Sequence, residues 1–132
     1  MTTNDPALLV GRILASAIFI LGGYGKLMAA AGTTAYFVKT GVPLPEIAYY
    51  VAVAVELGGG LLLLAGFQTR VVALVLAVFC VATALLAHMD FADRGQMVNF
   101  LKNMAMSGGY LAFMVAGAGR FSVDGALAAR RT

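Results

Sequence analysis

The sequence predicts an all-α membrane protein, a single domain over residues 1–132 built as a four-helix transmembrane bundle. Hydrophobic residues make up 61% of the chain and charged residues only 11%, so a soluble domain of this size would have to expose large apolar patches. Four apolar stretches of about 18–21 residues can each cross a hydrocarbon core of roughly 30 Å as a helix. They lie near residues 7–26, 47–66, 70–89 and 97–117.

The character of these stretches favours helices over strands. Within lipid, every backbone N–H and C=O must be paired inside the span. The stretches are continuously apolar, whereas the strands of a membrane barrel alternate at every second residue. We therefore expect four helices joined by short connections, except for the first connection.

The first stretch could instead be a secretory signal peptide, because Ala29-Ala30-Ala31 resembles a small-residue cleavage site. Two observations favour a retained helix. The leader MTTNDP has no Lys or Arg, and Arg12 interrupts the apolar run. We therefore expect this segment to remain as the first transmembrane helix.

The connection from Leu27 to Glu46 is too long for a tight turn. It mixes apolar and aromatic residues with a single lysine before Gly41 and Pro43 break the run. Either a short interfacial or re-entrant element or a passive connector at the membrane surface fits this composition.

The third stretch contains the only cysteine, Cys80, and ends at the only histidine, His88. A lone thiol cannot run a disulfide relay, so Cys80 is interpreted as a packing residue. The run His88-x-Asp90-x-x-Asp93 is too sparse to predict a metal site, and no metal is expected. We favour an interfacial His88 that makes a hydrogen bond or carries a proton.

The basic residues set the expected orientation through the positive-inside rule. One side of the membrane would carry Arg70, Arg120, Arg130 and Arg131, and the other Lys26, Lys39 and Arg94. This favours a multi-pass protein of the cytoplasmic (inner) membrane with both termini in the cytoplasm. The net charge is +3, but the basic residues are dispersed among the helix ends, which excludes nucleic acid as a partner and leaves the lipid bilayer.

Glu56 stands in the middle of the second stretch, where a charge costs roughly 2.5–3.5 kcal/mol on insertion scales. Such a residue usually faces a partner or a polar cavity. A structural ion pair with Arg12, about two turns into the first stretch, is the simplest account. Lys102 on the fourth stretch is the alternative partner.

Polar residues in the fourth stretch recur at helical spacing and define one stripe. Together with polar residues near the ends of the other stretches, they outline a pocket that opens toward the non-cytoplasmic face. Its candidate residues are Glu56, His88, Asn99, Lys102, Asn103 and Lys26. Such a pocket suits a carbonyl or hydroxyl ligand, for example a quinone head group, although purely structural pairing of the helices explains the same residues.

Glycines cluster at Gly22-Gly23, Gly58-Gly59-Gly60 and Gly108-Gly109. Between membrane helices, residues without a large side chain let the backbones approach closely. We interpret these glycines chiefly as packing positions, and they also permit a homo-oligomer.

In their order and positions, these features resemble the DoxX family of small four-helix inner-membrane proteins. The resemblance covers nearly the whole chain and follows a series of short motifs. These are Arg12 through Phe19, Gly22, Gly25-Lys26-Leu27, Gly41-x-Pro43, Glu56-x-Gly58-Gly59, Gly66-x-x-Thr69-Arg70, His88, Asn99-Phe100-x-Lys102-Asn103 and Gly117-x-Gly119.

The family takes its name from the membrane component of a thiosulfate:quinone oxidoreductase, and relatives are linked to oxidoreductase complexes and oxidative-stress defence. The resemblance implies an accessory or membrane-anchoring subunit of such a system, with a partner oxidoreductase subunit and quinone as the cofactor it allows. It also marks Arg12 beside the pocket residues.

The chain alone is not expected to be catalytic, because it has neither a redox cysteine pair nor paired haem ligands. A non-catalytic membrane scaffold or assembly factor is the alternative function. A small-solute or lipid carrier is the third.

Overall fold

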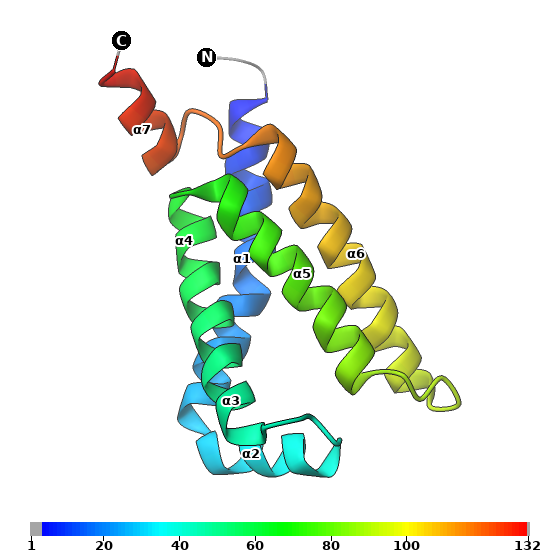
Figure 1. The fold of residues 1–132 in the computed structure, drawn as a ribbon. Helices are drawn as coiled ribbons and strands as arrows, with labels where there is room; N and C mark the ends of the chain where they lie inside the picture. Colours follow the sequence, from blue (N-terminus) through cyan, green and yellow to red (C-terminus); the bar gives the residue numbers. More distant parts are fainter. Residues whose placement is uncertain (1–3, 132) are drawn as a thin grey trace.

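The computed structural model describes residues 4–131, a range made of helices and their connections with no β-strand (Figure 1). This confirms the predicted all-α class. The elements in chain order are α1 (Asp5–Met28), α2 (Ala30–Lys39), α3 (Pro45–Val53), the π-helical turn η1 (Ala54–Gly58), α4 (Gly59–Ala65), α5 (Thr69–Ala87), α6 (Arg94–Ala116) and α7 (Val123–Ala129).

Three helical segments are long and apolar enough to cross a membrane: α1, the continuous rod α3–η1–α4 over Pro45–Ala65, and α5. Each matches a predicted stretch to within two residues at either end. Helix α6 is as long, with 23 residues, but its first half carries Asn99, Lys102 and Asn103 and it is not among the three. The fourth membrane span therefore stays a prediction.

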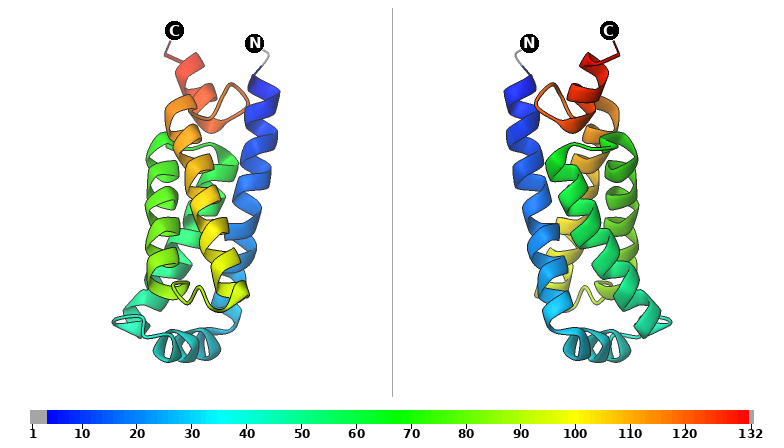
Figure 2. Two further views of the ribbon diagram at one scale, coloured as in Figure 1. Left: turned by 90° about the vertical axis from the view of Figure 1, so that its right-hand side faces the viewer. Right: turned by 90° about the vertical axis from the view of Figure 1, so that its left-hand side faces the viewer.

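The long helices are arranged as two pairs (Figures 1 and 2). Helix α1 packs against the rod, and α5 packs against α6. In the view of Figure 1 the pairs meet near the two chain termini, which share one end of the molecule, and diverge toward the other end. We call these the termini end and the α2 end.

Helix α2 runs across the α2 end, nearly perpendicular to the long helices (Figure 1). It has no fully buried residue and packs mainly against α3. The short element expected in the first connection is therefore a helix that covers one end of the bundle.

The core consists of apolar side chains and two hydrogen bonds from α6, of which the one to α1 joins the two helix pairs. Phe19, Leu76 and Cys80 lie in the main buried cluster, so Cys80 is a packing residue as expected. The Tyr110 hydroxyl donates to the Ala15 carbonyl of α1 at 2.7 Å, and the Ser107 hydroxyl donates to the Ala77 carbonyl of α5 at 3.1 Å. These bonds satisfy polar groups that lipid could not.

Glycines let α1 approach the rod closely. A Cβ atom at Gly23 would lie 2.6 Å from the Leu57 backbone nitrogen, and one at Gly60 would lie 3.1 Å from the Ile20 nitrogen. Neither position can hold a side chain unless the neighbouring atoms shift. Gly108 and Gly109 differ, because both are exposed and a Cβ there would meet no atom within 4 Å. Glycines of the first two clusters therefore pack against other helices of this chain, whereas Gly108 and Gly109 do not.

Candidate functional site

Glu56 lies inside the π-helical turn η1, in the middle of the second membrane-length segment. A π turn widens the helix by one residue, and such turns are frequently found at functional sites. The residue is 8% exposed. The local backbone thus departs from a regular helix at the position of the buried carboxylate.

The partner of Glu56 is Lys26, near the end of α1. The Lys26 Nζ atom lies 2.9 Å from Glu56 Oε2 and 3.2 Å from Oε1. Gly22, one turn earlier on α1, lies beside this pair. A Cβ atom there would lie 3.8 Å from Glu56 Oε2 and 3.9 Å from Lys26 Nζ. One positive and one negative group are therefore held together where α1 meets η1.

This ion pair forms part of the wall of a cavity of about 290 Å³ at the α2 end. The rest of the wall is mostly carbon, and it comes from both helix pairs and from α2. The lining includes Lys26, Tyr36, Phe37, Val42, Val51, Glu56, Phe79, Thr83, Leu86 and His88. We call this space the Glu56 cavity. A mostly apolar cavity with a few convergent polar groups is the usual form of a small-molecule site.

His88 follows α5 and contributes an imidazole to the cavity wall. Its Nδ1 atom lies 2.7 Å from Gln96 Oε1 on α6. With the amide oxygen as acceptor, Nδ1 carries the proton, and Nε2 of the neutral ring is left as an acceptor. His88 therefore links the cavity to a polar side chain beyond it.

The expected Arg12–Glu56 ion pair is wrong. Arg12 is fully buried, but it lies toward the termini end. Its Nη1 atom donates to the carbonyl of Leu64 at 2.8 Å, and its Nη2 atom donates to the carbonyl of Phe121. Leu64 comes eight residues after Glu56, about 12 Å along a helix. Arg12 thus donates to a carbonyl at the C-terminal end of α4, where carbonyls lack partners within the helix, and to one in the segment before α7.

The expected pairing of Glu56 with Lys102 is also absent. Asn99 and Lys102 are exposed on α6, and no residue of α6 lines the Glu56 cavity. Asn103 is half-buried and donates from Nδ2 to the Asn99 carbonyl at 3.0 Å. Of the six predicted pocket residues, the structure brings together Lys26, Glu56 and His88.

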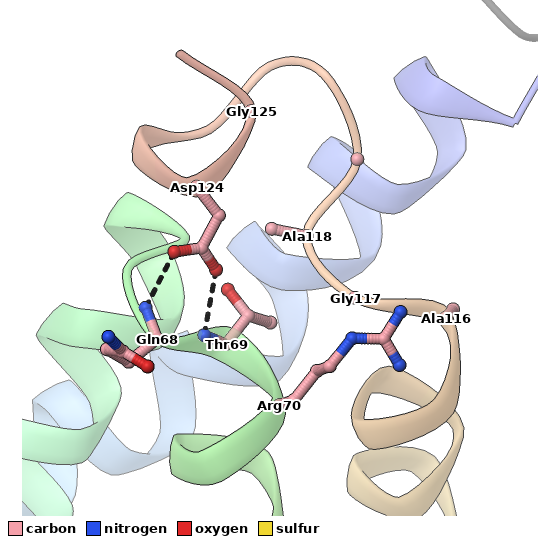
Figure 3. A pocket seen from close by; sticks show the side chains of 9 residues that line it. Gln68, Thr69, Arg70, Ala116, Gly117, Ala118, Asp124 and Gly125 are labelled. Atoms are coloured by element: carbon pink, nitrogen blue, oxygen red, sulfur yellow. Dashed lines mark hydrogen bonds between the residues drawn. The ribbon is translucent and has the colours of Figure 1, made fainter. Parts of the chain in front are cut away.

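A second hollow, of about 400 Å³, lies at the termini end (Figure 3). The Asp124 carboxylate accepts hydrogen bonds from the amides of Gln68 and Thr69, each at 2.9 Å, and so caps the start of α5. Arg70 donates to the Met114 carbonyl at 3.0 Å near the end of α6. The charged groups here satisfy helix ends, so we regard this hollow as structural.

The hydrogen bonds of Asp124 affect its ionisation. Partial burial acts to raise the pKa of this carboxyl. The amide hydrogen bonds from Thr69 and Gln68 and the positive charge of Arg12 outweigh that effect, so the pKa lies below its usual value. Asp124 stays charged and keeps its capping role.

Sequence reasoning missed two groups of residues. Asp124 and the capping Ser122 follow the last predicted stretch, where no helix was expected. Ser122 followed by an acidic residue and an alanine-rich run was the available signal for α7. The apolar lining of the cavity, for example Phe79 and Leu86, carried no signal, because apolar residues fill every face of a membrane helix.

Comparison with known proteins gives a consistent family. The DoxX family model matches residues 7–89. The inner membrane protein YqjF of Escherichia coli (strain K12) is 41% identical over 124 residues, which cover 92% of each chain. The inner membrane protein YphA of the same organism is 34% identical over 122 residues, 89% of this chain and 87% of the relative.

A more distant similarity covers half of the chain. CatD of Bacillus subtilis (strain 168) is 36% identical over 66 residues, 50% of this chain and 48% of the relative. It carries the name of an oxidoreductase whose activity is not established. No solved structure matches the chain.

Proposed function

Because the chain belongs to the DoxX family, we propose that it is a membrane-embedded accessory or anchoring subunit of a quinone-linked oxidoreductase or oxidative-stress system. In this proposal it holds the quinone head group in the Glu56 cavity. The observation that carries the proposal is the Lys26–Glu56 ion pair in the wall of an otherwise mostly apolar cavity. The inner-membrane relatives support the same cellular location, and we propose that both termini face the cytoplasm.

The residues of the cavity fit a quinone by their chemistry. A quinone head group is a flat apolar ring with two carbonyl oxygens, and its reduced form carries two hydroxyls. The Lys26 ammonium can donate to a carbonyl oxygen, and Glu56 can accept from a hydroxyl. Phe79, Phe37 and Tyr36 provide aromatic surfaces for the ring.

When bound, a quinone would supply the electron-accepting chemistry that a chain with one cysteine and one histidine lacks. The chain's own part is to position the head group and to move protons. In this proposal Glu56 would pass a proton to a head-group oxygen as the quinone takes up electrons from the partner subunit, and the Lys26 ammonium would donate a hydrogen bond to the head group. His88, whose ring is oriented by its hydrogen bond to Gln96, would then return a proton to Glu56 from the α2 end.

The name of CatD supports a redox role, although the similarity covers only half of each chain. The electron donor would belong to a partner subunit. A non-catalytic scaffold or assembly factor is the second candidate, and the observation that favours it is the outward polar face of α6, where Asn99 and Lys102 are exposed.

The experiment is a binding titration of short-chain ubiquinone with the purified protein in lipid nanodiscs, read by native mass spectrometry. Lys26→Met and Glu56→Gln each remove one charged hydrogen-bonding group from the cavity. Since a hydrogen bond to a charged group is worth about 1.5–3 kcal/mol, we expect the affinity to fall at least about tenfold.

Lys39→Met is the matched control, because Lys39 is exposed at the end of α2 and does not line the cavity. It should bind like the wild type. Equal binding by all four proteins would overturn the proposed site, and failure of the wild type to bind quinone would favour the scaffold.

A further inference from the structure

Helix α6 presents polar groups on its outward surface. In the left view of Figure 2 this helix runs along the front of the molecule, between α5 and α1. Asn99 and Lys102 lie on its exposed surface. Lys102 comes eight residues after the start of the helix, about 12 Å along its axis. If α6 spans the bilayer as predicted, this ammonium group faces lipid.

Nothing in the described part of the chain neutralises Lys102. Between residues 4 and 131 the only ion pair is Lys26–Glu56. The Glu56 carboxylate, in the middle of a membrane-length helix, therefore already has a partner. Helix α6 itself contains no Asp or Glu. Ionisable groups inside membrane segments almost always face a cavity or a partner charge. Lys102 is the exception in this molecule, since Arg12 and Lys26 both have partners.

Small residues continue the same surface. Ala105, Gly109 and Ala112 follow Lys102 at intervals of three and four residues, and all are exposed. A Cβ atom at Gly109 would meet nothing within 4 Å. Spacing of this kind allows a second helix to approach closely, so that van der Waals contacts and interhelical hydrogen bonds form. We call the surface made by Asn99, Lys102, Ala105, Gly109 and Ala112 the Lys102 face.

We propose that the Lys102 face binds a transmembrane helix of another polypeptide, and that this helix presents a carboxylate to Lys102. The charge specifies the partner, because a carboxylate is the group that would neutralise a lysine in lipid. A second copy of this chain fits poorly. A symmetric contact between two α6 helices would bring Lys102 against its own copy and would supply no acidic residue.

The first test uses a defined probe instead of an unknown partner. The full-length protein is placed in phosphatidylcholine vesicles with a membrane-spanning leucine/alanine peptide that carries one glutamate, and association is measured by energy transfer. A peptide with glutamine in place of the glutamate is the reference. We expect the glutamate peptide to bind at least about fivefold more tightly, and Lys102→Met to abolish the difference.

The control Lys39→Met removes a lysine from α2 and should preserve the fivefold preference. An equal affinity for the two peptides would overturn the proposal. So would a preference that persists in Lys102→Met. If Lys102 instead binds lipid phosphate, anionic vesicles will abolish the preference of the wild type for the glutamate peptide over the glutamine peptide. That result also contradicts the proposal.

The second test removes the close approach and leaves the charge. Gly109→Leu adds a side chain to the Lys102 face without a clash inside the chain, and Gly25→Leu does the same on α1, where a Cβ also meets nothing within 4 Å. We expect Gly109→Leu to lower association with the glutamate peptide and Gly25→Leu to leave it unchanged. Equal behaviour of the two variants would contradict the proposal. Neither test depends on quinone binding.

Discussion

Arg12 and Glu56 are both buried in membrane-length helices, and their surroundings differ. Arg12 is 0% exposed and donates to carbonyls from α4 and from the segment before α7. Glu56 is 8% exposed, has a single partner in Lys26, and borders a cavity of about 290 Å³. The Arg12 guanidinium is enclosed by its own chain, whereas Glu56 lies beside open space that a ligand could enter.

The same contrast separates the two ends of the molecule. At the termini end Arg12, Asp124 and Arg70 all bond to the backbone of helix ends. At the α2 end Lys26, Glu56 and His88 come from separate segments and face a common cavity. We therefore assign stability to the termini end and ligand binding to the α2 end, and substitutions should separate these roles.

The largest loss of stability is expected for Arg12→Met. The substitution removes the donor from the partly buried carbonyls of Leu64 and Phe121, and an unsatisfied buried group costs about 1–3 kcal/mol. We expect the free energy of unfolding to fall by about 3–5 kcal/mol, measured by denaturant titration in detergent. Arg94→Met removes an exposed arginine and serves as the control. An Arg12→Met protein as stable as the wild type would contradict the structural role assigned to Arg12.

Gly23→Ala should follow in magnitude. Its new Cβ would lie 2.6 Å from the Leu57 nitrogen, so α1 and η1 must separate. Overpacking of this kind costs about 1–3 kcal/mol, and it should also disturb the Lys26–Glu56 pair. Gly22→Ala is the matched control, because its Cβ would have ordinary contacts at 3.8 Å and beyond. Thermal unfolding in detergent distinguishes them, and equal melting temperatures would argue against a close helix contact.

Asp124→Ala should destabilise the termini end by about 0.5–2 kcal/mol through loss of the α5 cap. The effect depends on pH. Because the native pKa of Asp124 lies below its unfolded value, its contribution is complete above the ordinary aspartate pKa and is lost as the pH falls through the lower native value. Unfolding measured across the acidic range should therefore show a steeper loss for the wild type than for Asp124→Ala. Parallel curves would contradict this capping role.

Glu56→Gln should change stability least. Glutamine keeps an oxygen acceptor for Lys26, and Lys26 is partly exposed and can extend toward the α2 end. We expect a loss below about 1 kcal/mol in the same unfolding assay, together with the tenfold loss of quinone affinity. A variant that unfolds as readily as Arg12→Met would show that Glu56 is a structural residue.

The sequence was sufficient to predict the long helices, because the length of an apolar run and the thickness of a bilayer are directly comparable. The boundaries of α1, of the rod and of α5 agree with the predicted stretches to within two residues at either end. The sequence also singled out Glu56 as the ionic residue most in need of a partner. The depth of a residue in the bilayer depends on its position along the spanning helix, and that position can be read from the sequence.

The partner of Glu56 could not be predicted in this way. Choosing between Arg12, Lys26 and Lys102 requires the rotation of each helix about its axis and the distance between helices. For α1 the close approach at Gly23 limits both, through a contact with Leu57 that exists only in the folded protein. Asp124 and the carbonyl partners of Arg12 were missed for a similar reason. Hydropathy describes side chains and does not show which backbone groups in turns need hydrogen-bond partners.

The most direct test of the division between the two ends is to map where a photoreactive short-chain quinone attaches to the wild-type protein in nanodiscs. Mass spectrometry of the digested protein would locate the label. We predict modification in the segments that line the Glu56 cavity, from Phe79 to His88 and around Tyr36 and Phe37, and loss of this labelling in Lys26→Met. Labelling centred on Gln68, Gly119 and Asp124 at the termini end would contradict the assignment.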